Sequence, residues 1–132
     1  MVTKININVE IKDQDIDDIV CTALEGGINY WCNSAQIGEK TYYGKYASDQ
    51  ISRGGTLIIY VDEPFEEQET YTLTKAKLIN GITQYLKDPV MSKDILTRGK
   101  EKGIFEIDCC QVDAVVADII IQYALFGEEI YG

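Results

Sequence analysis

The most constraining feature of this sequence is an apolar stretch close to its C-terminal end, Glu106–Gly132. We expect a helix over residues 109–126, capped by Asp108 with Gln111 completing a capping box. Gly127 supplies a stop at its C-terminal end. A helix that is apolar nearly all round is buried rather than laid on a surface. We therefore expect it to be the central helix of a small domain or the interface of an oligomer. Its apolar residues fill both sides: Val112, Val115, Val116, Ile119, Ile120 and Tyr123 on one, Ala114, Ala117, Ile121 and Leu125 on the other.

The rest of the chain predicts strands as well as helices. Residues 3–11 alternate between apolar and polar side chains, as in a strand with one buried face. Residues 56–62 hold a continuous apolar run, which is typical of a strand buried on both faces. Apolar residues at helical spacing predict two further helices, over 15–26 and 74–88. We therefore predict one α+β domain, residues 1–132, in which three helices pack against a small antiparallel sheet.

Local signals indicate where the two earlier helices begin and end. Asp15 and Thr74 are the expected N-caps, because their side-chain oxygens can accept hydrogen bonds from the first turn. Gly26 and Gly27 are expected to end the first helix, and Pro89 the second. Three other stretches are expected to be loops, the first of them a hairpin or an ordered loop: residues 34–55, 63–69 and 90–107.

The overall charge narrows the classes of partner. The chain carries 12 basic and 22 acidic residues, a net charge of −10, so nucleic acid and anionic membranes are not expected partners. No apolar run approaches about 18 residues and no basic and apolar leader is present, so we expect no membrane span and no signal peptide. The protein is predicted to be cytoplasmic.

The residues that usually carry metals or acid–base chemistry are few. Histidine is absent, which removes the commonest metal ligand and the usual general base near neutral pH. The four cysteines fit neither a disulfide framework nor a zinc ribbon, so we expect reduced thiols and no metal or cofactor. An enzyme would have to use carboxylates, cysteines or tyrosines. Asp108, Asp113 and Asp118 are the candidate carboxylates on or near the C-terminal helix. The alternative is that each is exposed or hydrogen-bonded within the fold.

The only two arginines, Arg53 and Arg98, predict an anion site. Each lies in an expected loop and precedes a glycine. The planar guanidinium matches phosphate or carboxylate, and glycine lets backbone amides approach an anion. The alternative is a solvated or ion-paired arginine at each position.

Aromatic residues supply the other half of a possible nucleotide site. Trp31 and Tyr46 precede the first arginine, and Tyr71 comes just before a predicted helix N-terminus. Bases stack on such rings, and helix N-termini accept phosphates. Asn80 and Gly81 both lower helix propensity within a predicted helix, and Asn80 could bind a base or ribose edge. The alternative is ordinary packing for the rings and a partly exposed asparagine.

Four segments, which together cover most of the chain, carry a resemblance to a known family: DIDDIVCTALEGGINYWC, YASDQISRGGTLIIY, YTLTKAKLINGITQYL and EIDCCQVDAVVADIIIQYALFGEEIYG. In this order they resemble a family of small phage and prophage proteins of Firmicutes, the first described phage Thoeris anti-defence sponges. Members of that family sequester cyclic ADP-ribose isomers made by bacterial TIR-domain immune enzymes, and do not hydrolyse them. They assemble through dimers into larger oligomers, with pockets at subunit interfaces.

The resemblance implies a non-catalytic homo-oligomer that binds a cyclic ADP-ribose isomer in the host cell. It does not by itself assign binding residues, so these follow from the chemistry above: Arg53, Arg98, Tyr71, Asn80, Trp31 and Tyr46. The pyrophosphate suits the arginines, and the adenine suits Tyr71 or Trp31. Because the chain is strongly acidic, a dianionic ligand requires a locally positive pocket.

Three alternatives remain at this point. An acidic phage inhibitor could bind a basic surface of a host or defence enzyme, occupying its nucleic-acid groove. A small hydrolase could use the candidate aspartates. A structural virion protein would bind no nucleotide.

Overall fold

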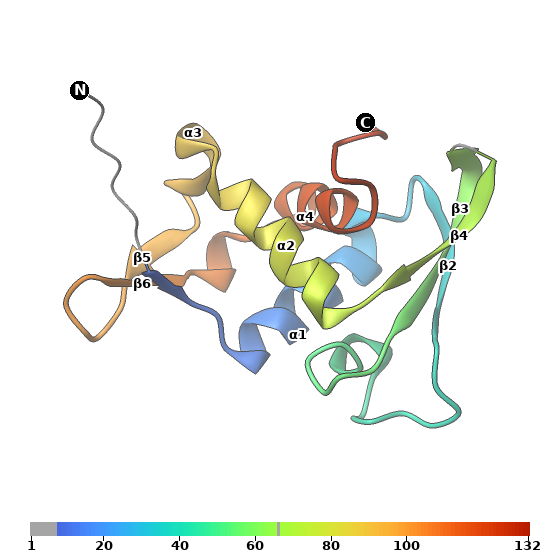
Figure 1. Cartoon of the computed structure of the whole chain (residues 1–132), viewed down its shortest axis with the longest axis horizontal. Coiled ribbons are helices and arrows are strands. Elements are labelled where there is room, and N and C mark those ends of the chain that lie inside the picture. The colour runs from blue at the N-terminus through green and yellow to red at the C-terminus, as the bar shows by residue number, and fades with distance from the viewer. Residues whose placement is uncertain (1–7, 66) are drawn as a thin grey trace.

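Two small sheets lie at the two ends of the structure, with the helices between them (Figure 1). The computed structural model describes residues 8–65 and 67–132 and confirms the predicted α+β class. The strands are β1 (Asn8–Glu10), β2 (Cys32–Ile37), β3 (Leu57–Phe65), β4 (Gln68–Leu73), β5 (Leu96–Arg98) and β6 (Ile104–Ile107). The helices are α1 (Asp13–Thr22), α2 (Lys75–Leu86), α3 (Pro89–Ser92) and α4 (Ala114–Phe126).

The strands form two sheets rather than the single antiparallel sheet that we predicted. One has the order β2-β3-β4 and is antiparallel throughout. The other has the order β1-β6-β5, in which β1 is parallel to β6. The predicted strands 3–11 and 56–62 therefore belong to different sheets, and residues 3–7 lie outside the described residues.

Four strands arise where the sequence shows no clear alternation. β5 and β6 lie in a stretch that we expected to be a loop, and β4 begins in another. Most of β2 lies in the first expected loop, residues 34–55. β4 illustrates the reason: five of its six residues are exposed or half-buried, because β4 is an edge strand of its sheet. Partner strands, rather than a hydrophobic pattern, define such a strand.

The C-terminal helix α4 is central, as predicted, but it begins later than expected. Asp113 caps it, accepting a hydrogen bond of 2.9 Å from the backbone N–H three residues on. Asp108 caps a separate 3₁₀ turn, Cys109–Gln111, and extended backbone follows that turn. The predicted helix 109–126 is therefore two elements. Gly127 ends α4 in the left-handed conformation, with φ of +74°, which confirms the predicted stop.

The other helix ends agree in part with the sequence signals. Thr74 caps α2 through its side chain, as predicted. The N-cap of α1 is Lys12 instead of Asp15, whose carboxylate accepts a hydrogen bond of 2.9 Å from the Lys12 backbone N–H. α2 ends at Leu86, and Pro89 is the first residue of α3 because proline is well suited to the first turn of a helix.

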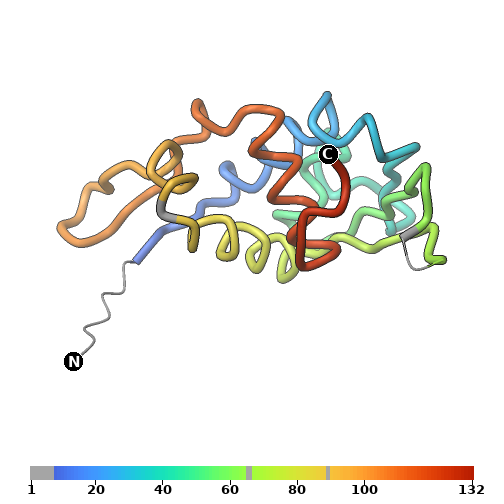
Figure 2. Tube along the Cα trace, turned by 90° about the horizontal axis from the view of Figure 1, so that it is seen from above, coloured from blue at the N-terminus to red at the C-terminus, as the bar shows by residue number. Residues whose placement is uncertain are grey.

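α2 crosses α4 at a position where only glycine fits. Figure 2 shows α2 (yellow) along the lower edge of the view and α4 (red) beside it, in agreement with the contacts between the two helices. A Cβ atom on Gly81 would lie 2.6 Å from the carbonyl oxygen of Ile120 and 2.9 Å from the backbone nitrogen of Ala124. Gly81 lowers the helix propensity of α2, and the close approach of the two backbones explains why a glycine is nevertheless present there.

The close approach predicts a large effect for a single methyl group. We expect Gly81→Ala to lower the free energy of unfolding by about 1–3 kcal/mol, since α2 must move away from α4 and overpacking outweighs the gain in helix propensity. Urea denaturation measures the effect. Gly26→Ala is the matched control, because a Cβ there meets nothing within 4 Å. Equal stability of the two variants would contradict the close contact.

Candidate functional site

The two arginines lie in different parts of the structure. Arg98 is the last residue of β5, in the sheet at the left of Figure 1. Arg53 lies in the turn that leads into β3 in the other sheet, where its Nη1 atom is 3.4 Å from the carbonyl oxygen of Asp49. Both side chains are exposed. One copy of the chain therefore does not bring the two guanidinium groups onto the same ligand.

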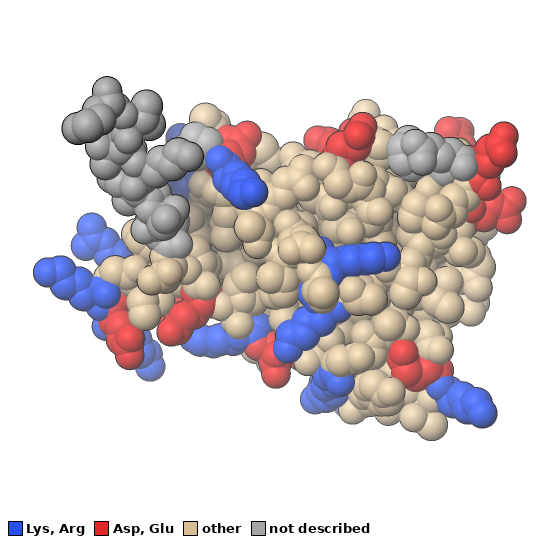
Figure 3. Space-filling view, viewed as in Figure 1, with Lys and Arg blue, Asp and Glu red and all other residues tan. Residues whose placement is uncertain are grey.

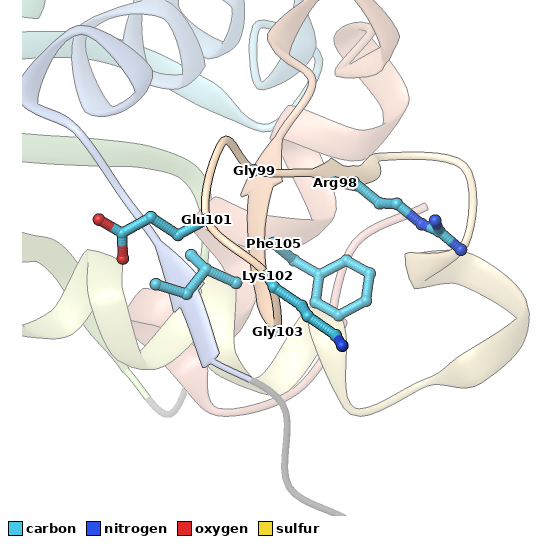
Figure 4. A pocket seen from close by; sticks show the side chains of 7 residues that line it. Arg98, Gly99, Glu101, Lys102, Gly103 and Phe105 are labelled. Atoms are coloured by element: carbon cyan, nitrogen blue, oxygen red, sulfur yellow. The ribbon is translucent and has the colours of Figure 1, made fainter.

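Arg98 lines a cavity of about 350 Å³ at the β5–β6 hairpin, which we call the hairpin pocket. The side chains of Arg98 and Lys102 lie on the same side as the Phe105 ring, whereas the Glu101 carboxylate points away from it (Figure 4). The pocket thus combines two cationic groups with an aromatic ring. Its lining residues are Arg98, Gly99, Glu101, Lys102, Gly103, Ile104 and Phe105. This combination suits a phosphate joined to a planar group.

A second group of cations comprises Lys75 and Lys77, in the first turn of α2, and Arg53, whose side chain lies against Asp49. We call these three residues the α2 cation cluster. The Lys75 Nζ atom is 3.5 Å from the carbonyl oxygen of Ser52, the neighbour of Arg53, and 3.3 Å from an Asp13 oxygen. No acidic residue occupies the first turn of α2, and the helix dipole adds positive potential there. Figure 3 shows Lys and Arg side chains gathered on this face around α2 and along its lower edge. Cations therefore gather on this face in a chain of net charge −10, with Asp13 paired to Lys75.

Asn80 lies beside Lys77 of this cluster. Tyr46 lies on the Arg53 side, since Asp49 accepts hydrogen bonds from the Tyr46 backbone N–H and from Arg53. Asn80 is exposed on α2, three residues after Lys77, so the two side chains share one face of the helix. Tyr46 is 58% exposed and lines another cavity, of about 450 Å³, together with Cys21 and Leu24.

Trp31 and Tyr71 are brought together, but as parts of an aromatic cluster with Phe126 and Tyr131. Trp31 stacks on Tyr131 with ring centroids 5.2 Å apart and planes 6° apart. Phe126 meets Trp31 and Tyr71 edge-on, at 5.6 and 4.8 Å. Only 2% of Trp31 is exposed, whereas Tyr71 is half-buried. This arrangement is expected if the rings serve ordinary packing rather than base stacking. Tyr71 retains more exposed surface than Trp31.

A buried carboxylate lies behind the aromatic cluster. Asp118, on α4, is 6% exposed and accepts three hydrogen bonds. The donors are Trp31 Nε1 at 2.7 Å, Tyr30 Oη at 2.5 Å and Gln122 Nε2 at 2.9 Å. Burial, and then the hydrogen bond to Asp118, raise the pKa of Tyr30 to about 12. We call these four residues the Asp118 network.

Gln122 of this network also holds the C-terminal residues in place. Its Oε1 atom accepts hydrogen bonds of 2.8 Å from the backbone N–H groups of Ile130 and Tyr131. Its Nε2 atom donates to the Tyr131 carbonyl at 3.0 Å. Sequence reasoning did not identify Gln122. A signal was present, because Asp118 and Gln122 are polar residues at i, i+4 spacing within an otherwise apolar helix.

The candidate catalytic groups are engaged in structural contacts. Asp108 and Asp113 cap the elements that follow them, and Asp118 is hydrogen-bonded to three neutral donors. Burial raises the pKa of the Cys32 thiol to about 11 and, with the neighbouring Asp15 carboxylate, that of Cys109 to about 12. These two thiols are therefore protonated near neutral pH and are poor nucleophiles.

Comparison with known proteins gives no family for this chain: no protein-family model, curated protein or solved structure matches it. Within residues 8–65 and 67–132, no helix has both the length and the apolar character needed to cross a bilayer. In the same part of the chain, no three His, Cys, Asp or Glu side chains gather as metal ligands.

The raised pKa of Tyr30 predicts a pH-dependent contribution to stability. The hydroxyl is harder to ionise in the folded chain than at its ordinary pKa of 10, so its contribution is complete below pH 10 and is lost as the pH rises toward 12. The stability gap between wild type and Tyr30→Phe should therefore be widest below pH 10 and narrow toward pH 12.

Urea denaturation at a series of pH values tests this expectation. Tyr42→Phe is the control, since Tyr42 is 58% exposed and lies outside the Asp118 network. A gap for Tyr30→Phe that stays constant from pH 10 to pH 12 would disprove the role given to its hydroxyl.

Proposed function

We propose that this chain binds and sequesters a cyclic ADP-ribose-type signalling nucleotide without cleaving it, as a phage or prophage anti-defence protein. The hairpin pocket is the observation that carries the proposal. It offers two cations for a pyrophosphate and the Phe105 ring for a planar base in a cavity of about 350 Å³. The resemblance of the sequence to the Thoeris anti-defence sponges supplies the ligand class.

The charge distribution supports an anionic ligand despite the acidity of the chain. A pyrophosphate carries two negative charges, and a chain of net charge −10 repels it at long range. The hairpin pocket brings Arg98 and Lys102 together, and Lys75 and Lys77 are both exposed in the first turn of α2. Because arginine can hold a phosphate with two parallel hydrogen bonds, Arg98 and Arg53 are the residues that we assign to the pyrophosphate.

The separation of the two arginines favours a site shared between copies of the chain. Arg98 lies in the β1-β6-β5 sheet, and Arg53 lies before β3 in the other sheet. We propose a homo-oligomer in which the hairpin pocket of one copy faces the α2 cation cluster of another. Asn80, beside Lys77, would then contact the sugar or base of the same ligand.

The carboxylates support binding without hydrolysis. Asp108, Asp113 and Asp118 all hold backbone or side-chain donors of their own chain. A general base must instead reach the water or hydroxyl that it activates. We therefore expect the nucleotide to leave the protein intact.

A capture-and-release experiment tests the proposal. The purified protein is incubated with the products of a TIR-domain enzyme, washed and denatured by heat, and the released molecules are identified by mass. We expect an intact cyclic ADP-ribose isomer. Empty protein would disprove sequestration of this ligand class, and a cleaved nucleotide would indicate a hydrolase.

Substitution of the arginines locates the binding. We expect Arg53→Ala with Arg98→Ala to weaken capture by at least about 100-fold, since hydrogen bonds to charged groups contribute about 1.5–3 kcal/mol each. Lys40→Ala with Lys87→Ala makes the same change in net charge at exposed lysines outside the hairpin pocket and the α2 cation cluster, and should retain capture. Equal losses in the two variants would show that net charge alone governs binding.

A second candidate function is an acidic inhibitor that binds a basic surface of a host or defence enzyme. The β3–β4 hairpin favours it, because Asp62, Glu63, Glu67 and Glu69 are all exposed there. Acidic side chains gather at the corresponding right-hand end of Figure 3. An inhibitor of this kind would keep its activity in the double arginine variant, whereas a nucleotide sponge would lose it.

A further inference from the structure

A cavity of about 350 Å³ lies beside the C-terminal residues, and we call it the tail pocket. Its lining is opposite in character to that of the hairpin pocket, because no lysine or arginine contributes to it. The lining residues are Tyr30, Trp31, Asp62, Glu63, Tyr131 and Gly132. The pocket therefore combines aromatic rings with carboxylates.

The aromatic rings of the tail pocket are held in position by the fold. Tyr131 stacks on Trp31, and its hydroxyl donates a hydrogen bond of 2.6 Å to the carbonyl oxygen of Glu63. Tyr30 is 55% exposed, and its hydroxyl is held by Asp118. Aromatic faces attract cations, and the attraction is strongest for weakly hydrated organic ones. The rings are thus positioned before any ligand arrives.

Three carboxylates give the tail pocket a negative potential. Asp62 and Glu63 are exposed and line it directly, and Asp118 lies behind Tyr30 and Trp31. All three donors to Asp118 are neutral, so its negative charge is not cancelled. Neither of the two salt bridges found within residues 8–65 and 67–132 includes any of these carboxylates. An anion is repelled from this pocket, and a cation is attracted.

We propose that the tail pocket binds an organic cation, an ammonium or guanidinium group carried on an apolar stem. The carboxylates of Asp62 and Glu63 pair with the charge at the rim, and the rings of Tyr30 and Tyr131 contact the stem and the head group. The same chemistry is presented by a small quaternary amine and by a lysine or arginine side chain of another protein. The site is distinct from the hairpin pocket and does not depend on nucleotide capture.

The sole tryptophan of the chain provides the measurement, because Trp31 lines this pocket. Tetramethylammonium chloride and an N-acetylated, C-amidated Gly-Arg-Gly peptide are titrated separately while Trp31 fluorescence is recorded, with sodium chloride at equal ionic strength as the blank. Equilibrium dialysis repeats each titration, so that binding without a change in emission is still counted. We expect saturable binding of the cations and none of sodium.

Paired variants of the β3–β4 hairpin test the role of the tail pocket. Asp62→Asn with Glu63→Gln should weaken cation binding at least tenfold. Glu67→Gln with Glu69→Gln makes the same change in net charge on exposed residues of the same hairpin outside the pocket, and should change binding less than twofold. Circular dichroism verifies that both variants are folded.

The outcomes separate the sources of the cation and can overturn the proposal. Tighter binding of the peptide assigns the site to a basic protein side chain, and tighter binding of tetramethylammonium assigns it to a small amine. Absence of saturable binding to both probes overturns the proposal. Equal weakening in the two variants overturns it as well, because long-range charge would then explain the attraction.

Discussion

The buried carboxylate of Asp118 is the interaction on which the arrangement of this protein depends. Removing an ionised carboxylate from water costs several kcal/mol, so it must be met by well-placed donors. Trp31 and Tyr30 come from the segment before β2, and Gln122 comes from the next turn of α4. Gln122 in turn binds the C-terminal backbone at Tyr131. One charge thus fixes the central helix, the start of one sheet and the end of the chain relative to one another.

Positive and negative side chains are concentrated in different places on the surface, whereas the composition gives only the net charge. Cations gather at the β5–β6 hairpin and around the N-terminal end of α2, whereas the β3–β4 hairpin and the tail pocket are acidic and aromatic. An anionic nucleotide and an organic cation would therefore be directed to different faces of the same chain. The net charge of −10 describes neither face.

Several features were predictable because they depend on neighbours in the sequence. The Thr74 cap and the Gly127 stop each involve backbone groups within about one turn of helix, and both were identified correctly. The central place of α4 followed from its apolar residues alone. The prediction that Asp15 is the N-cap of α1 was wrong, although its carboxylate does act at the start of this helix. Asp15 lies in the first turn, and its carboxylate accepts a hydrogen bond from the backbone N–H of Lys12, which is the N-cap.

The sequence by itself determined the α+β class and the presence of a buried C-terminal helix, and it supplied the residues that we propose for phosphate and base binding. The tertiary structure alone decided which of those residues meet. Tyr30 and Asp118 are 88 positions apart, and Gly81 fits only because another helix backbone lies against it. Helical periodicity and capping arise from contacts within a few residues, so they leave a pattern in the sequence. Segments far apart in the chain decide how strands pair, where helices cross and which donors meet a buried charge. Such contacts therefore leave no local pattern in the sequence.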